Sequence, residues 1–278
     1  MKISAPVIGL FIALFLLSCS GENKQIIERY EDGSPKLIRV FEGHGKDKKK
    51  IRELLLWNNG NTKKDIAYDG NKKQGTYYSY YENSVLEAEK QYYLNRENGV
   101  QRFWHENGQL KYEYTAVYGL ISGKKTMWYD NGKIEEDRFF IDGQENGMQR
   151  GWFDNGQKEF EYEAIEGQKN GQFSKWFRNG QKEIEFSCVK DTVDEHLTAW
   201  YMNGIKRLEF NFKNFKFEGA QKSWDGDGNL IYYFENYLQD STKSKQRVHF
   251  GNYETWLSDH WELIKYVFDK YGLVSAIK

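Results

Sequence analysis

The segment that decides the fold is Trp128-Tyr129-Asp130-Asn131-Gly132-Lys133. It recurs 24 residues later as Trp152-Phe153-Asp154-Asn155-Gly156-Gln157, and again as Trp176-Phe177-Arg178-Asn179-Gly180-Gln181. Its glycine keeps this period along most of the chain, a second glycine follows fifteen residues after it, and an aromatic residue stands four residues before it. Three columns in phase over seven periods indicate an array of structural repeats, which we place at residues 30–240.

The columns have few exceptions. Ser84 fills the gap among the first glycines, and Glu195 replaces one second glycine. A degenerate first unit has its turn at Asp32-Gly33, 27 residues before Gly60, and we expect the three extra residues in the solvated stretch Lys46–Lys50. The columns are Gly60, Gly108, Gly132, Gly156, Gly180, Gly204 and Gly228; Gly75, Gly99, Gly123, Gly147, Gly171 and Gly219; and Tyr80, Trp104, Trp128, Trp152, Trp176, Trp200 and Trp224.

Each period contains two tight turns and two short extended segments, which predicts a β-hairpin. A three-residue loop at 106–108, with its glycine in the left-handed conformation, pairs Trp104 with Leu110. The tryptophan column is then expected to share one apolar face with Tyr112 and its counterparts and to be structural. Cys188 falls in the same series, where we interpret it as a small packed hydrophobe. The counterparts of Tyr112 are Phe160, Ile184, Leu208 and Tyr232.

The opposite face is the candidate binding face. It is expected to carry an aromatic column and, beside it, an unbroken acidic column. Exposed aromatic residues can anchor a protein partner, and carboxylates can select a basic one. Alternatively, the aromatic residues support cross-strand pairing and the carboxylates solvate the sheet. The columns are Tyr81, His105, Tyr129, Phe153, Phe177 and Tyr201, and Glu89, Glu113, Asp137, Glu161, Glu185 and Glu209.

The phased segments around Gly132, Gly156 and Gly180, together with Lys169-Asn170-Gly171 at the second turn, resemble the bacterial variant of the MORN repeat. The resemblance covers about residues 30–236. It implies an all-β fold, an elongated single-layer antiparallel sheet. It also implies roles in scaffolding and in contacts with proteins or membranes.

Composition argues against several functional classes. The chain has 40 Lys and Arg against 41 Asp and Glu, so it lacks the cationic excess of nucleic-acid-binding proteins. Its five histidines share neither the repeat phase nor metal-ligand spacing, and no nucleophile elbow or phosphate-binding loop occurs. Equal carboxylates along a flat sheet do not form the desolvated, unequal pair that acid–base catalysis needs. We therefore expect a protein that is not an enzyme and binds no cofactor or metal.

The N-terminus resembles a bacterial lipoprotein signal. An apolar stretch at 7–17 is too short to span a bilayer and ends in Leu16-Leu17-Ser18-Cys19, as in a lipobox. This resemblance predicts a signal peptide at 1–18, lipid on Cys19 and a tether to residue 29, which would anchor the protein at the cell envelope, on the outer membrane if the host has one. An ordinary secretory signal is the alternative.

The last segment, 241–278, breaks the period. Between Asn252 and Tyr271, apolar residues recur at helical spacing, which predicts a helix that caps the open end of the sheet. A helix that binds a partner is the alternative. The apolar positions are Trp256, His260, Leu263, Ile264, Val267, Phe268 and Tyr271.

Together these features predict a membrane-anchored lipoprotein whose repeats form a non-catalytic scaffold for a protein partner at the envelope. Pairing with a second copy of the chain stays open. The alternative function is a module that binds a carbohydrate polymer of the cell wall, since aromatic β-hairpin repeats also occur in wall-binding proteins.

Overall fold

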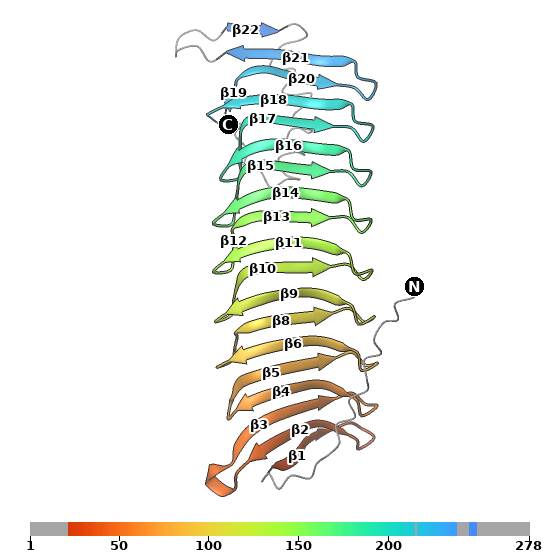
Figure 1. The fold of residues 1–278 in the computed structure, drawn as a ribbon, viewed down its shortest axis with the longest axis vertical. Helices are drawn as coiled ribbons and strands as arrows, with labels where there is room; N and C mark the ends of the chain where they lie inside the picture. Colours follow the sequence, from red (N-terminus) through yellow and green to blue (C-terminus); the bar gives the residue numbers. More distant parts are fainter. Residues whose placement is uncertain (1–21, 215, 238–244, 249–278) are drawn as a thin grey trace, which may run out of the picture.

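The described residues form one open antiparallel sheet in which each long strand pairs with the next long strand along the chain, and three two-residue strands pair only with the strand before them (Figure 1). The computed structural model describes residues 22–214, 216–237 and 245–248. The predicted all-β architecture of stacked hairpins is therefore confirmed for these residues. The predicted signal peptide, Cys19 and most of the C-terminal segment lie outside them.

The elements of the first half end at β11. They are β1 (Asn23–Arg29), β2 (Pro35–Glu42), η1 (Gly45–Asp47), β3 (Lys49–Leu56), β4 (Thr62–Asp69), β5 (Lys72–Tyr80), β6 (Leu86–Tyr93), β7 (Arg96–Glu97), β8 (Gly99–Trp104), β9 (Leu110–Val117), β10 (Leu120–Trp128) and β11 (Ile134–Ile141). The second half comprises β12 (Gln144–Glu145), β13 (Gly147–Trp152), β14 (Lys158–Ile165), β15 (Gln168–Trp176), β16 (Lys182–Val189), β17 (Thr192–Trp200), β18 (Lys206–Lys213), β19 (Lys216–Phe217), β20 (Gly219–Trp224), β21 (Leu230–Tyr237) and β22 (Lys245–Val248).

The first turn of each repeat has the predicted three-residue loop. In the hairpin of β8 and β9, the amide of His105 bonds to the carbonyl of Gln109 at 2.8 Å, and Gly108 lies in the left-handed region at φ 83°. Trp104 pairs with Leu110, as predicted. The extra residues of the first unit lie in the longer loop between β2 and β3, which contains η1.

A β-bulge behind this turn overturns the predicted face of the tryptophan column. Trp104 pairs with Leu110, but Phe103 pairs with Tyr112, so Lys111 has no partner in the ladder. The bulge adds one residue to one strand and moves the next side chain to the other face. The rings of Phe103 and Tyr112 stack with centroids 4.1 Å apart, whereas Trp104 lies on the opposite face. The same bulge follows the other tryptophans of the array.

The sheet therefore has two unlike faces. The packed face carries Phe103, Tyr112 and their counterparts, while the ionic face carries the tryptophan column and the acidic column. Lys182 shows this arrangement, because its ammonium group bonds to Glu185 and lies 5.9 Å from the centre of the Trp176 ring.

The core lies on the packed face of β14–β19. Phe186 and Leu197 are completely buried there, and Cys188 is 2% exposed. The Cys188 thiol donates to the carbonyl of Gly171 at 3.5 Å, and burial raises its pKa to about 11. The prediction that this cysteine is a packed hydrophobe is confirmed. The cluster comprises Tyr162, Ala164, Phe173, Ile184, Phe186, Cys188, Val193, Leu197, Ala199, Leu208, Phe210, Phe212 and Phe217.

The two exceptions to the glycine columns keep the turn geometry. Ser84 and Glu195 adopt φ 68° and φ 70°, close to the glycines they replace. A side chain in this region meets the backbone and costs about 1 kcal/mol. The turns at both positions therefore keep the register of the repeat, and the backbone of Ser84 and Glu195 is strained.

We expect Ser84→Gly to raise the free energy of unfolding by about 0.5–1 kcal/mol, because relief of this strain exceeds the entropy that glycine adds to the unfolded chain. Urea denaturation measures the change. The reverse substitution at the equivalent position, Gly60→Ser, should destabilise by a similar amount because Gly60 has φ 85°. Equal stabilities for Ser84→Gly and the unchanged chain would show that the strain is absent.

Candidate functional site

The predicted aromatic column connects neighbouring repeats. The hydroxyl group of Tyr81 donates to the carbonyl of Trp104 at 2.8 Å, and that of Tyr129 donates to Trp152 at 2.7 Å. Tyr201 bonds in the same way to Trp224 at 3.1 Å. Phe153 and Phe177 share the column without a hydroxyl group. Tyr30, Trp57 and His105 make the corresponding bond, so the column joins neighbouring first turns wherever its residue carries a hydroxyl group or a ring nitrogen.

We expect Tyr129→Phe to lower the free energy of unfolding by about 1 kcal/mol, since it removes one hydrogen bond between repeats and leaves the ring in place. Phe153→Tyr is the matched control. It adds a hydroxyl group at the equivalent position, and it should stabilise if the bond geometry is repeated there. A Tyr129→Phe variant as stable as the unchanged chain would contradict a structural role for these hydroxyl groups.

The predicted acidic column lies on the ionic face as a ladder of ion pairs. Arg102 reaches Glu113 at 2.6 Å, and Arg150 reaches Glu161 at 2.8 Å. The cations come from the adjacent strand or from a lysine three residues before the carboxylate. Asp137, Glu185 and Glu209 are paired with Lys124, Lys182 and Lys206 respectively. The negative charge of the acidic column is thus neutralised by arginine and lysine side chains of the same array, and the column is not a continuous negative strip.

The ladder makes stability depend on pH. Burial acts to raise the pKa of Glu209, but hydrogen bonds from Lys206 at 2.5 Å and Lys222 at 3.1 Å outweigh it, so the pKa is lowered. A lowered pKa in the folded state contributes stability above the unfolded value of 4.5, and this contribution is lost as pH falls through the folded value. Glu209→Gln should therefore be less stable than the unchanged chain at pH 7, and the difference should shrink below pH 4.5. A difference that is independent of pH would contradict the pairing.

The two predicted columns do not meet in one site. The bulge that places the tryptophans on the ionic face leaves Tyr81 and its counterparts at the turn edge of the packed face, where Tyr81 lies with Tyr77 and Ser79. The acidic column remains on the ionic face with the tryptophans. The predicted joint surface of aromatic and acidic residues is therefore divided between opposite sides of the sheet.

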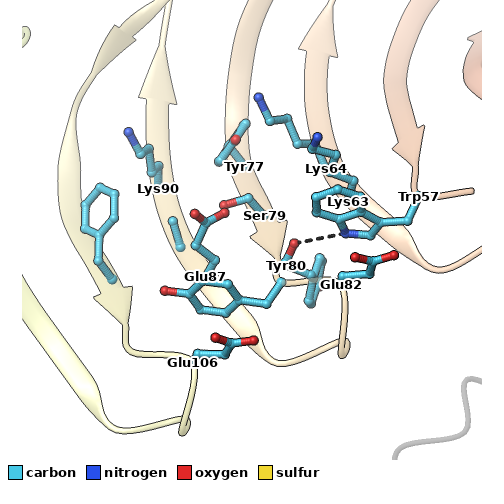
Figure 2. A pocket seen from close by; sticks show the side chains of 13 residues that line it. Trp57, Lys63, Lys64, Tyr77, Ser79, Tyr80, Glu82, Glu87, Lys90 and Glu106 are labelled. Carbon is cyan, nitrogen blue, oxygen red and sulfur yellow. Dashed lines mark hydrogen bonds between the residues drawn. The ribbon is translucent and has the colours of Figure 1, made fainter. Parts of the chain in front are cut away.

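A hollow of about 600 Å³ lies on the packed face of the N-terminal half, across three consecutive hairpins (Figure 2). Strands β4, β5, β6 and β8 supply its floor, and three first turns supply one rim. Figure 2 shows Glu82 and Glu106 at this rim and Lys64 and Lys90 towards the middle of the strands. The lining residues are Trp57, Lys63, Lys64, Tyr77, Ser79, Tyr80, Tyr81, Glu82, Glu87, Ala88, Lys90, Phe103 and Glu106.

Lysine ammonium groups lie over two of the aromatic rings that line the hollow. The Lys63 ammonium group lies 3.9 Å from the centre of the Trp57 ring, and the Lys90 ammonium group lies 4.8 Å from that of Phe103. The Trp57 ring is also held by a 3.3 Å hydrogen bond from its indole nitrogen to the carbonyl of Tyr80 (Figure 2). In the described part of the chain, neither Glu82 nor Glu106 forms an ion pair. The hollow thus presents acidic groups on its rim and cations over its rings.

Three segments of the chain, 73–95, 97–117 and 122–142, match the family model of the MORN repeat variant. Residues 73–142 therefore contain three consecutive repeats of the MORN variant type. Repeats of this type generally serve contacts with proteins or membranes. The matched segments span the hairpins from β5 to β11, and the hollow extends from the preceding hairpin into the beginning of this region. No curated protein showed significant similarity to the chain.

The first turns also carry a ladder of asparagine side chains, which the glycine, aromatic and acidic columns do not include. The Asn131 side chain accepts a bond from the amide of Lys133 and donates to the carbonyl of Asp154 at 3.2 Å. Asn155 and Asn179 repeat this arrangement. The asparagine before most first glycines could have indicated it, because an asparagine side chain closes such turns and still has a free donor.

Over the ranges that the structure describes, no three His, Cys, Asp or Glu side chains converge to hold a metal ion. Within the same ranges, no helix is long and apolar enough to cross a membrane.

Proposed function

We propose that the MORN repeats act as a non-catalytic scaffold that binds a protein partner at the bacterial envelope through the N-terminal hollow. The hollow at Trp57–Glu106 is the observation that carries the proposal. Three hairpins contribute to it, and it has acidic groups without ion pairs on its rim. An extended segment of a partner with a basic side chain directed towards Glu82 and Glu106 fits this charge arrangement.

The ionic face is a less suitable binding surface, because the charges of its carboxylates are already neutralised by ion pairs. Its carboxylates already bind arginine and lysine from neighbouring strands, and a basic partner would have to displace these cations. The rim of the hollow requires no such exchange. We therefore place recognition on the packed face, and Tyr81 is the one residue of the expected binding columns that lines the proposed site.

Binding of a wall carbohydrate is less well supported. Sugar rings stack on open aromatic faces, whereas Trp57 and Phe103 are covered by lysine ammonium groups. The lysines would have to move away before a neutral glycan could use these rings.

The membrane anchor in the proposal is Cys19, which the lipobox-like Leu16-Leu17-Ser18 precedes. Two or more acyl chains would hold the protein at a membrane surface. Metabolic labelling with an alkyne fatty acid tests this part: the label should appear on the unchanged chain and disappear in Cys19→Ala. Equal labelling of both chains would contradict it.

Capture from envelope extracts tests the binding surface. The unchanged protein should retain a specific envelope protein, and Glu82→Lys/Glu106→Lys should lose it. Glu161→Lys/Glu185→Lys makes the same charge change on the ionic face and should retain it. Loss with the second variant alone would place recognition on the acidic column, and binding of wall fragments without any protein would favour the carbohydrate function.

A further inference from the structure

The packed face changes its character along the array. In the N-terminal half it carries lysines, tyrosines and an arginine, and Tyr112 and Tyr114 are partly exposed. The residues of β16–β18 that pair across strands on this face are all apolar, and Ile184 and Phe186, the equivalents of Tyr112 and Tyr114, are 1% and 0% exposed. The apolar series is Ile184, Phe186, Cys188, Val193, Leu197, Ala199, Leu208, Phe210 and Phe212. The two halves of this face therefore differ in both composition and burial.

A single-layer sheet does not by itself bury such a surface. Neighbouring strands cover the sides of a side chain, but its end points away from the sheet, and an apolar face of this kind requires a second layer. Among the described residues the only helical element is η1 (Gly45–Asp47), at the other end of the array. The cover over β16–β18 must therefore come from another segment or molecule.

We propose that residues 252–271 of this chain form an amphipathic helix that packs across β16–β18 on the packed face. The apolar positions from Trp256 to Tyr271 follow helical spacing, while Glu262, Lys265 and Asp269 fall on the other side of the same helix. This segment matches the apolar surface that lacks a described second layer. It differs from the expected cap, which would cover only the open edge of the last strand.

The chain has the length to reach this surface. The described sheet ends at β22 (Lys245–Val248), which is five strand positions from β16, or about 24 Å at 4.8 Å per strand. A helix of about 20 residues is about 30 Å long. The segment begins four residues after Val248 and can therefore turn back over β21 and β20 and cover β16–β18.

Cys188 is a built-in reporter for this cover. In a full chain that carries Cys19→Ser, Cys188 is the single thiol, and its alkylation by maleimide at pH 8 should be slow. Leu263→Glu/Val267→Glu places charges on the apolar side of the helix and should uncover the thiol. Because the pKa of Cys188 is raised from 9.0 to about 11, uncovering should increase the alkylation rate by about 100-fold. Glu262→Lys/Lys265→Glu exchanges charges on the polar side and should leave the rate unchanged.

A second thiol separates local uncovering from unfolding. Ala88 lies on the packed face of the N-terminal half and is 3% exposed. In a chain with Ala88→Cys, Cys19→Ser and Cys188→Ser, Leu263→Glu/Val267→Glu should leave the alkylation rate unchanged. An unchanged rate at Cys188, or equal acceleration at both positions, would overturn the proposal. Protection of Cys188 that rises with protein concentration would overturn it in favour of a second copy as the cover.

Discussion

Gly151→Ala should lower the free energy of unfolding by about 2–3 kcal/mol, although it adds a single methyl group. Gly151 pairs with Phe160, and the phenyl ring lies over the glycine so closely that a Cβ atom would stand 2.1 Å from Cε1. The backbone does not require glycine here, since its φ is not in the left-handed region. The cost therefore comes from overpacking, which forces the ring out of its position. Urea denaturation measures the change.

The chain supplies a matched rescue for this substitution. Two repeats further along, Ala199 pairs with Leu208 at the positions equivalent to Gly151 and Phe160. Gly151→Ala/Phe160→Leu reproduces that pair, and it should be more stable than Gly151→Ala alone. A double variant that shows the sum of the two single losses would contradict the steric explanation, because independent effects add.

Arg138→Met should lower the free energy of unfolding by about 2–3 kcal/mol. Arg138 is 20% exposed and bonds to Glu136 at 2.9 Å and to Glu145 at 2.7 Å. It also donates to the Tyr162 hydroxyl group, which in turn donates to Glu145 at 2.7 Å. Removing the cation leaves two partly buried carboxylates without a counter-ion, and such unpaired charges are costly.

Neutral substitutions of the carboxylates distinguish this effect from lost packing of the arginine stem over Phe160, which lies 5.0 Å from the guanidinium carbon. If the unpaired carboxylates cause the loss, Glu136→Gln/Glu145→Gln should restore part of the stability when it is added to Arg138→Met. Arg138→Lys keeps the charge and should lose less at pH 7. A deficit of Arg138→Met that is the same with and without the two glutamines would identify packing as the cause.

The sequence was sufficient to predict the period, the hairpins and the first turn. Glycine at a left-handed position is a strong local signal, and the register at Trp104 and Leu110 followed from it. The faces could not be predicted in the same way. The bulge at Lys111 leaves the 24-residue period unchanged, so a repeat pattern does not reveal it, yet it and its equivalents exchange the face of the tryptophan column.

The candidate binding surfaces could likewise be predicted only in part from the sequence. The acidic column was visible because the carboxylates repeat, but its partner Arg102 comes from the adjacent strand and varies between repeats. The hollow depends on Lys63, Glu82 and Phe103, which belong to three different hairpins and to different repeat positions. Because these residues do not recur at one repeat position, the repeat pattern of the sequence does not identify them. Only the pairing of strands brings them together.

Site-specific photo-crosslinking in cells tests the central claim most directly, namely that a partner binds the packed face of the N-terminal half. A crosslinking residue is placed at Glu87 in the hollow, at Glu183 at the equivalent repeat position in β16, and at Thr115 on the ionic face. We expect a specific adduct with an envelope protein from position 87 and none from positions 115 and 183. The same adduct from position 115 alone, or equal adducts from all three positions, would contradict the account.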